Sequence, residues 1–175
     1  MLRCPRGKDR GSMTQPECLE CMRCRQAYPL DAFDRNCASC VAAGVSSNLT
    51  LRYPDTAPPD RDALPVSPNS LWRYDSFLPL DADDAVTLGE GMTPMIPVDG
   101  FGHGPIRVKD EYRNPTWSFT DRLATVAVSW ARKIGAPAIA TSTPGNAGSA
   151  PADQPPRAAL ACWVRPCKGQ AGALE

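Results

Sequence analysis

Apolar residues recur with a helical period in one part of the chain, residues 118–134. Four large apolar side chains are spaced three or four positions apart, which places them on one face of a helix: Phe119, Leu123, Val126 and Trp130. Ser118 and Asp121 have the spacing of a capping box, and Gly135 and Pro137 supply the stop. The pattern predicts an amphipathic helix that begins near Ser118.

Two short runs on either side of this helix have the character of strands. Residues 106–109 (Ile-Arg-Val-Lys) precede it, and residues 138–141 (Ala-Ile-Ala-Thr) follow it as a buried strand. Strand, helix and strand in this order predict a right-handed β-α-β unit. The fold class is therefore α/β.

The segment before these elements carries aromatic side chains and a glycine turn. Trp72, Tyr74 and Phe77 are expected to be apolar anchors over a core, and Gly89 and Gly91 mark a tight turn.

Composition divides the rest of the chain. Nineteen prolines among 175 residues are too many for a compact helical domain, so extended or poorly ordered segments are expected. Five segments are predicted along the chain: a disordered lead-in (1–16), a cysteine-rich ribbon (17–44), a proline-rich linker (45–69), a partial α/β domain (70–150) and a degenerate tail (151–175).

Charge and hydropathy exclude several classes of partner. Lys and Arg balance Asp and Glu at 19 each, so net charge favours neither nucleic acid nor a membrane surface. No apolar run reaches the roughly 20 residues that a membrane span needs, and the basic N-terminus lacks the apolar core of a signal peptide. A cytoplasmic protein is expected, with no membrane or nucleic-acid partner, and its oligomeric state is left open.

Two Cys-x-x-Cys pairs, separated by twelve residues, form the first candidate site. They are Cys21 with Cys24 and Cys37 with Cys40, a spacing typical of a zinc ribbon in which four thiolates close a structural site. Disulfides and redox-active thiols are the alternatives, and metal is favoured because the chain has no secretory signal. Cys18 offers a competing pair with Cys21.

Residues 109–122 carry the second candidate site, with the sequence Lys-Asp-Glu-Tyr-Arg-Asn-Pro-Thr-Trp-Ser-Phe-Thr-Asp-Arg. This block resembles the K-D-E-x-x-N-P-T-G-S-F-K-D-R motif of threonine synthases and related fold-type-II pyridoxal-phosphate enzymes. Three further blocks resemble the family in the same order: the ribbon around Leu19-Glu20-Cys21, the run from Leu71-Trp72 to Met92-Thr93-Pro94, and the turn around Gly145. By this resemblance the chain is the N-terminal part of a fold-type-II enzyme, and Cys21 pairs with Cys24 rather than with Cys18.

The resemblance implies pyridoxal phosphate as a cofactor, a small amino-acid substrate, and the conversion of O-phospho-L-homoserine and water to threonine and phosphate. The family's Schiff-base lysine falls at Thr120, whose hydroxyl cannot form an imine. Trp117 replaces a glycine, and its bulk is expected to intrude on the pocket. Substrate and cofactor contacts are carried over by resemblance to the next glycine-rich turn: Ser142, Thr143, Gly145, Asn146, Ala147 and Gly148.

Three functions follow from these observations. The first is a threonine synthase-like lyase, which the substitution at Thr120 argues against, with Lys109, Lys133 and Lys168 as candidate substitute amines. The second is a zinc-ribbon binding module attached to an inactive enzyme remnant. The third is a truncated product with a reading-frame disturbance after about residue 143, where prolines interrupt the expected helix.

Overall fold

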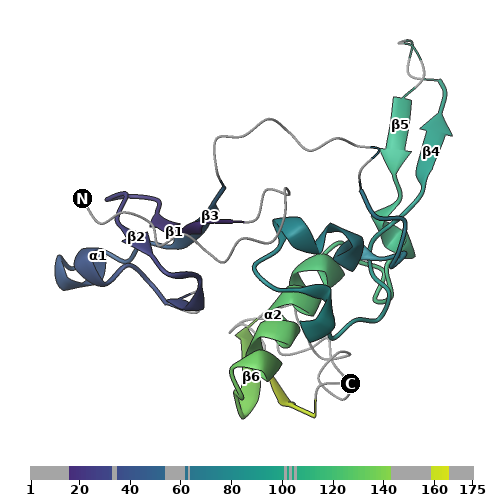
Figure 1. The fold of residues 1–175 in the computed structure, drawn as a ribbon. Helices are drawn as coiled ribbons and strands as arrows, with labels where there is room; N and C mark the ends of the chain where they lie inside the picture. Colours follow the sequence, from purple (N-terminus) through teal and green to yellow (C-terminus); the bar gives the residue numbers. More distant parts are fainter. Residues whose placement is uncertain are drawn as a thin grey trace. The chain divides into compact units, whose positions relative to one another are not determined.

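A computed structural model describes most of the chain, and Figure 1 shows its elements. The described residues are 16–32, 35–53, 62, 64–100, 102, 104, 106–142 and 159–165. The chain divides into two compact units, Met1–Leu64 with Tyr74–Pro79 and Pro65–Arg73 with Leu80–Glu175. None of the helices in the described ranges is both long and apolar enough to cross a membrane.

The first unit is built on a three-stranded antiparallel sheet in the order β2-β1-β3. Its strands are β1 (Cys18–Cys21), β2 (Ala27–Tyr28) and β3 (Leu49–Arg52). A 3₁₀ helix, η1 (Leu30–Ala32), and a five-residue helix, α1 (Ala38–Ala42), lie between β2 and β3 in the chain. All four residues of β1 are buried, so the central strand supplies the core of this unit.

Strand β3 stands where the sequence predicts a linker. Leu49 and Leu51 are partly buried and alternate with exposed Thr50 and Arg52. This is the two-residue period of a strand that covers a core on one side. The linker is predicted from the high proline content of residues 45–69 as a whole, and the short strand within this segment contains no proline.

The second unit contains one long helix, α2 (Asp121–Lys133), and two small sheets. Strands β4 (Met95–Val98) and β5 (Ile106–Lys109) form an antiparallel pair, and β6 (Ala138–Ser142) and β7 (Ala161–Arg165) form a parallel pair. The described residues also form the 3₁₀ helices η3 (Leu71–Phe77, kinked at Tyr74), η4 (Ala82–Asp84) and η5 (Glu111–Arg113), of which η3 spans the boundary between the two units.

The predicted strands and helix are present, but the predicted β-α-β unit is wrong in its pairing. Strand β5 pairs with β4 and β6 pairs with β7, so the strands on either side of α2 belong to different sheets. The order of elements alone cannot distinguish a crossover within one sheet from a helix that joins two sheets. Strand β6 is also only half-buried rather than buried.

Helix α2 buries a different face from the one that large apolar residues predict. Phe119, just before the helix, and Leu123, within it, are 67% and 70% exposed, whereas Val126 and Trp130 are buried. The inward face consists mainly of small and polar residues: Asp121, Ala124, Thr125, Val128, Ser129 and Ala131. Residues 121, 125 and 129 are four apart, as expected for one helical stripe.

Hydroxyl groups on this stripe join α2 to the segments packed against it. The Trp72 indole Nε1 donates to Thr125 Oγ1 at 2.8 Å, and that hydroxyl donates to the Val86 carbonyl at 2.7 Å. Ser129 Oγ accepts from the Val86 N–H at 2.8 Å. Thr125 and Ser129 are fully buried, so their bonds take the place of solvent for several main-chain and indole groups.

The start of α2 differs from the predicted capping box. Thr120 occupies the N-cap position with helical dihedral angles and no side-chain capping bond. The Asp121 carboxylate instead accepts bonds from the Thr116 N–H at 2.8 Å and the Thr116 hydroxyl at 2.6 Å. Asp121 therefore fixes the preceding turn rather than closing a cap with Ser118.

Candidate functional site

Four cysteine side chains meet in the first unit. Cys21 ends β1, Cys24 follows in the turn, Cys37 precedes α1 and Cys40 lies within it. Their sulphur atoms all lie within 4.8 Å of one another, with Cys21 and Cys40 3.8 Å apart and Cys24 and Cys37 3.5 Å apart. The four residues predicted from their spacing are thus the four that the fold brings together.

This sulphur cluster fits a tetrahedral thiolate site. Zinc–sulphur bonds of about 2.3 Å put neighbouring sulphurs about 3.8 Å apart on a tetrahedral edge. The Cys21–Cys40 and Cys24–Cys37 distances, 3.8 Å and 3.5 Å, agree with that spacing to within a few tenths of an ångström, and all the sulphurs lie within 4.8 Å of one another. Cys21, Cys37 and Cys40 are buried and Cys24 is exposed, so an ion bound here would be largely shielded from water.

Hydrogen bonds make two of these thiols acidic. The contact with the Ser47 hydroxyl, 3.3 Å from Cys21 Sγ, lowers the pKa of Cys21 to about 5. The backbone N–H groups of Arg23 and Cys24 donate to the same sulphur at 3.4 Å and contribute to this lowering of its pKa. The Tyr28 hydroxyl lowers the pKa of Cys37.

Burial has the opposite effect at Cys40, where it raises the pKa to about 12. Four crowded thiols cannot all ionise without a positive charge among them. A divalent cation would supply that charge, because it displaces the thiol protons when it binds.

Cys18 lies outside the sulphur cluster. It is the first residue of β1, is fully buried and pairs with Arg52 of β3 in the sheet register. Cys18 is disulfide-bonded and is not one of the four clustered thiols. The preference for Cys21 with Cys24 over Cys18 with Cys21 stays a prediction.

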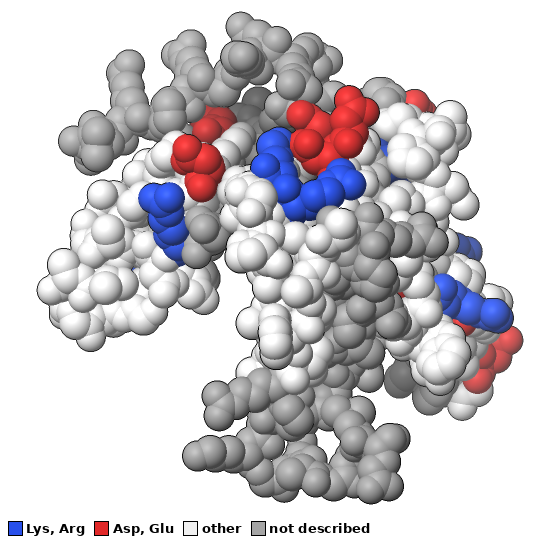
Figure 2. All heavy atoms as spheres, turned by 90° about the horizontal axis from the view of Figure 1, so that it is seen from below, with Lys and Arg blue, Asp and Glu red and all other residues white. Residues whose placement is uncertain are grey.

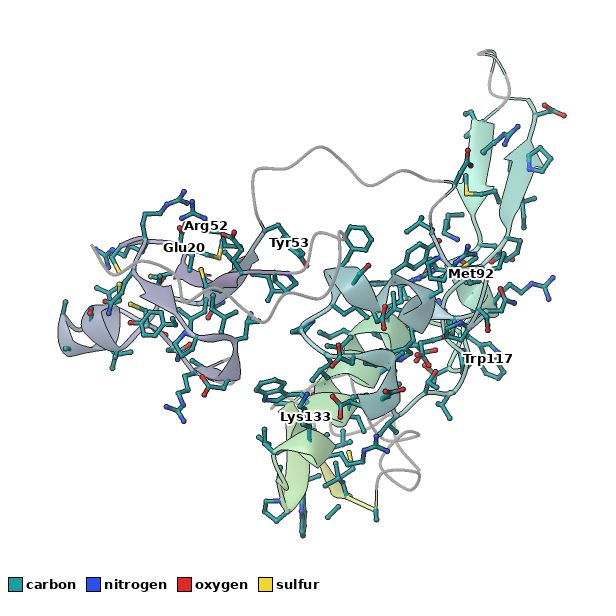
Figure 3. The ribbon with its side chains drawn as sticks, viewed as in Figure 1. Glu20, Arg52, Tyr53, Met92, Trp117 and Lys133 are labelled. Atoms are coloured by element: carbon teal, nitrogen blue, oxygen red, sulfur yellow. The ribbon has the colours of Figure 1, made fainter. Side chains whose placement is uncertain are left out.

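Two arginines of the ribbon form ion pairs with one glutamate. The Glu20 carboxylate accepts from Arg25 Nε at 2.9 Å and from Arg52 Nη1 at 3.0 Å, and Figure 3 shows Glu20 beside Arg52. On the face drawn in Figure 2, basic and acidic side chains of the described residues lie next to each other rather than in fields of one sign.

The second candidate site surrounds Thr120 at the start of α2. Its hydroxyl lies 2.7 Å from Ser118 Oγ, and its N–H donates to the same oxygen at 3.2 Å. A pocket of about 250 Å³ opens beside it between α2 and β6. The pocket is lined by small and aliphatic residues and two threonines: Thr120, Leu123, Ala124, Ala127, Val128, Ile139, Ala140 and Thr141.

This pocket does not fit the covalent attachment of pyridoxal phosphate. The aldehyde of the cofactor needs an amine, and the described lining contains no lysine. Ser142 is at the exposed end of β6 and is not part of the lining. Thr143, Gly145, Asn146, Ala147 and Gly148 lie outside the described residues.

Trp117 has an exposed side chain, labelled in Figure 3. It is 67% exposed and stacks on Tyr112 with ring centroids 6.1 Å apart and planes 13° apart. Its φ of 59° is in the left-handed region that favours glycine, so the backbone keeps the conformation suited to the glycine of the resembling motif. The expectation that its bulk intrudes on the family's pocket stays a prediction, because the glycine-rich turn of that pocket lies outside the described residues.

A network of charged side chains holds the turn before α2 and was not predicted from the sequence. Arg122 donates to both oxygens of Glu111 at 2.8 Å, and this pairing lowers the pKa of Glu111 to about 2. Thr93 Oγ1 donates to Glu111 at 2.6 Å, and Asn114 Nδ2 donates to it at 2.9 Å. The only signal in the sequence is that the block has charged residues of both signs at its two ends, Lys-Asp-Glu and Asp-Arg.

The same network explains the glycine turn. The Gly91 N–H donates to Asn114 Oδ1 at 2.9 Å, and Gly91 has a φ of 98°. A side chain at this position would come within 2.8 Å of the Leu71 backbone nitrogen. The turn therefore needs glycine both for its conformation and for its close approach to Leu71.

Comparison with known proteins gives matches to a family model and to several named enzymes. A family model described as "Pyridoxal-phosphate dependent enzyme" matches residues 86–152. A threonine synthase of Methanosarcina acetivorans is 31% identical over 137 residues, a match that covers 75% of this chain and 32% of that protein. A threonine synthase of Synechocystis is 38% identical over 116 residues, covering 58% of this chain and 30% of that protein.

A shorter match has a different name. A 2-amino-4-ketopentanoate thiolase beta subunit from an unknown prokaryotic organism is 44% identical over 65 residues, covering 37% of this chain and 14% of that protein. The chain spans about a third of the length of the threonine synthases it matches.

Proposed function

The chain belongs to the threonine synthase family of pyridoxal-phosphate-dependent enzymes, and we propose that it does not carry out the family's chemistry itself. Its working site is the sulphur cluster of Cys21, Cys24, Cys37 and Cys40, which holds one structural zinc ion. The α/β unit supplies the family's scaffold around Thr120 without the amine that the resemblance requires there.

One observation supports this proposal: position 120 carries a hydroxyl that is hydrogen-bonded to the Ser118 hydroxyl. Thr120 Oγ1 lies 2.7 Å from Ser118 Oγ, at the mouth of an aliphatic pocket. A hydroxyl can form no imine with an aldehyde, and no second residue of the described lining carries an amine. The described lining of this pocket therefore contains no amine that could form the covalent link to the cofactor.

The other described lysines are engaged elsewhere. Lys109 Nζ donates to the Thr93 carbonyl and to the Thr93 hydroxyl, and lies 3.9 Å from Glu111. Lys133 Nζ pairs with Asp84 at 2.6 Å. Both side chains are therefore engaged in hydrogen bonds or ion pairs away from position 120, which opposes their use as nucleophilic amines there. Lys168 lies outside the described residues.

The role proposed for zinc follows from the geometry of the ribbon. Four thiolates complete a tetrahedral coordination sphere, so an ion held by all four has no open position for a substrate. The zinc ion would have a structural role: it would cross-link β1, α1 and the turns between them. A unit with three short strands has little apolar core, and metal binding contributes folding free energy to such units.

The test is reductive trapping of pyridoxal phosphate on the purified, zinc-loaded chain. After borohydride treatment, intact mass and peptide mapping should show no site-specific adduct on the wild-type chain. Thr120→Lys restores an amine beside the pocket and should yield one adduct at position 120. Ile134→Lys adds an amine at the other end of α2, where the side chain is exposed, and controls for non-specific labelling. A stoichiometric adduct at a single lysine of the wild-type chain would overturn the proposal.

A further inference from the structure

Tyr28 contacts the sulphur cluster through its hydroxyl group. Its Oη lies 3.2 Å from Cys37 Sγ, and the ring packs against the buried cysteines from the end of β2. Pairing with Leu19 of β1 fixes the register of β2 and so the position of the ring. The tyrosine is thus placed by the same sheet that carries Cys21.

A second hydrogen bond determines which way the tyrosine proton points. The Ala38 N–H donates to Tyr28 Oη at 3.0 Å. The hydroxyl therefore accepts from the first residue of α1 and has its own proton free for the sulphur. A metal-bound thiolate has no proton to give, so in the loaded site the bond must run from Tyr28 to Cys37.

We propose that Tyr28 is a positioning residue for the metal centre: it donates a hydrogen bond to the Cys37 thiolate and so sets the affinity and electron donation of that ligand. The inference rests on the proposed zinc site. It adds a residue to that site that the four-cysteine spacing does not reveal, because a tyrosine hydroxyl is not a zinc ligand of this type of ribbon.

The chemistry of the bond gives its expected effect. A donor to a thiolate stabilises the charged sulphur and fixes its orientation, which lowers the free energy of the site with its ligands deprotonated. Losing such a donor typically weakens metal binding by roughly 10- to 100-fold. Losing the donor also raises the energy of the sulphur lone-pair electrons, because no proton then draws on their charge.

The experiment compares Tyr28→Phe with the full-length wild-type chain. The substitution keeps the ring that packs on the cluster and removes only the hydroxyl. Tyr53→Phe is the matched control, since Tyr53 belongs to the same unit and its hydroxyl donates to the Phe77 carbonyl rather than to a sulphur. Zn²⁺ affinity is measured by competition with a chromophoric chelator, and the sulphur-to-metal charge-transfer bands are measured with Co²⁺ in place of Zn²⁺.

We expect Tyr28→Phe to weaken Zn²⁺ binding by at least roughly 10-fold and to move the Co²⁺ bands to lower energy, while Tyr53→Phe does neither. Unchanged affinity in Tyr28→Phe overturns the inference and leaves the zinc site standing. Weaker binding with unmoved bands also overturns it, because the hydroxyl would then act through packing alone. A wild-type chain that binds no metal overturns both the inference and the proposed site.

Discussion

Thr125 joins three segments of the second unit through one hydroxyl. It accepts from the Trp72 indole and donates to the Val86 carbonyl, so a single buried oxygen satisfies a donor and an acceptor. Water cannot replace the hydroxyl as a hydrogen-bond partner of Trp72 or Val86, since Trp72, Val86 and Thr125 are all buried. Unsatisfied buried groups are costly, which makes this residue more important than its size suggests.

Replacing Thr125 by valine tests that role at nearly constant volume. Thr125→Val strands the indole N–H and the Val86 carbonyl, and we expect the free energy of unfolding to fall by about 1–3 kcal/mol. Urea unfolding followed by tryptophan fluorescence measures it. Thr141→Val, the same change at a half-buried position on β6, should cost less than about 0.5 kcal/mol. Equal losses in the two variants would show that the bonds of Thr125 contribute nothing special.

Glu111 makes part of the stability dependent on pH. The paired N–H groups of Arg122, with Thr93 and Asn114, lower its pKa from 4.5 to about 2 in the folded chain. A lowered pKa means that the folded state favours the carboxylate. The stabilisation is therefore complete above pH 4.5 and is lost as the pH falls from 4.5 toward 2.

We expect Glu111→Gln to remove this acid-sensitive stabilisation. At pH 6 the variant should be less stable than wild type by about 1–3 kcal/mol, and the difference should shrink as the pH approaches 3. Arg122→Lys keeps a positive charge but not the paired N–H groups, so an intermediate loss is expected. The measurement is the urea midpoint at each pH. A difference between wild type and Glu111→Gln that stays constant from pH 6 to pH 3 would contradict the pKa assignment.

Elements with a local sequence signal could be predicted from the chain. The strand at residues 106–109 has the predicted bounds, and the helix ends at Lys133, just before Gly135. The four cysteines could also be predicted, because Cys-x-x-Cys pairs describe local turns whose two thiols must point the same way. The turn within each pair is local, whereas the meeting of the two pairs joins residues 13 to 19 positions apart.

Elements that depend on distant partners could not be predicted in the same way. The choice of β4 as the partner of β5 is a matter of long-range pairing. The buried face of α2 is set by what packs on it, so Leu123 is exposed although it is apolar, and Ser129 is buried although it is polar. The sequence does place three polar residues four positions apart, at 121, 125 and 129, and this spacing could have indicated the buried face of α2.

The whole molecule combines a family scaffold with a changed chemical group. The residues that hold the scaffold together match the resembling motif, including Glu111, Asn114, Asp121 and Arg122, and each has a structural partner. The group that would do chemistry does not match, because position 120 carries a hydroxyl. The likeness to the family therefore rests on scaffold residues, and position 120 departs from it.

The consequence for the whole molecule is that it should release no phosphate from O-phospho-L-homoserine. With pyridoxal phosphate and zinc present, we expect the wild-type chain to match the protein-free background in a phosphate-release assay, because no amine at position 120 can hold the cofactor. The threonine synthase of Methanosarcina acetivorans, run in parallel, shows that the assay detects turnover. Phosphate release that requires both the chain and the cofactor would contradict the prediction, and peptide mapping after borohydride would then identify the lysine that has taken over the role of position 120.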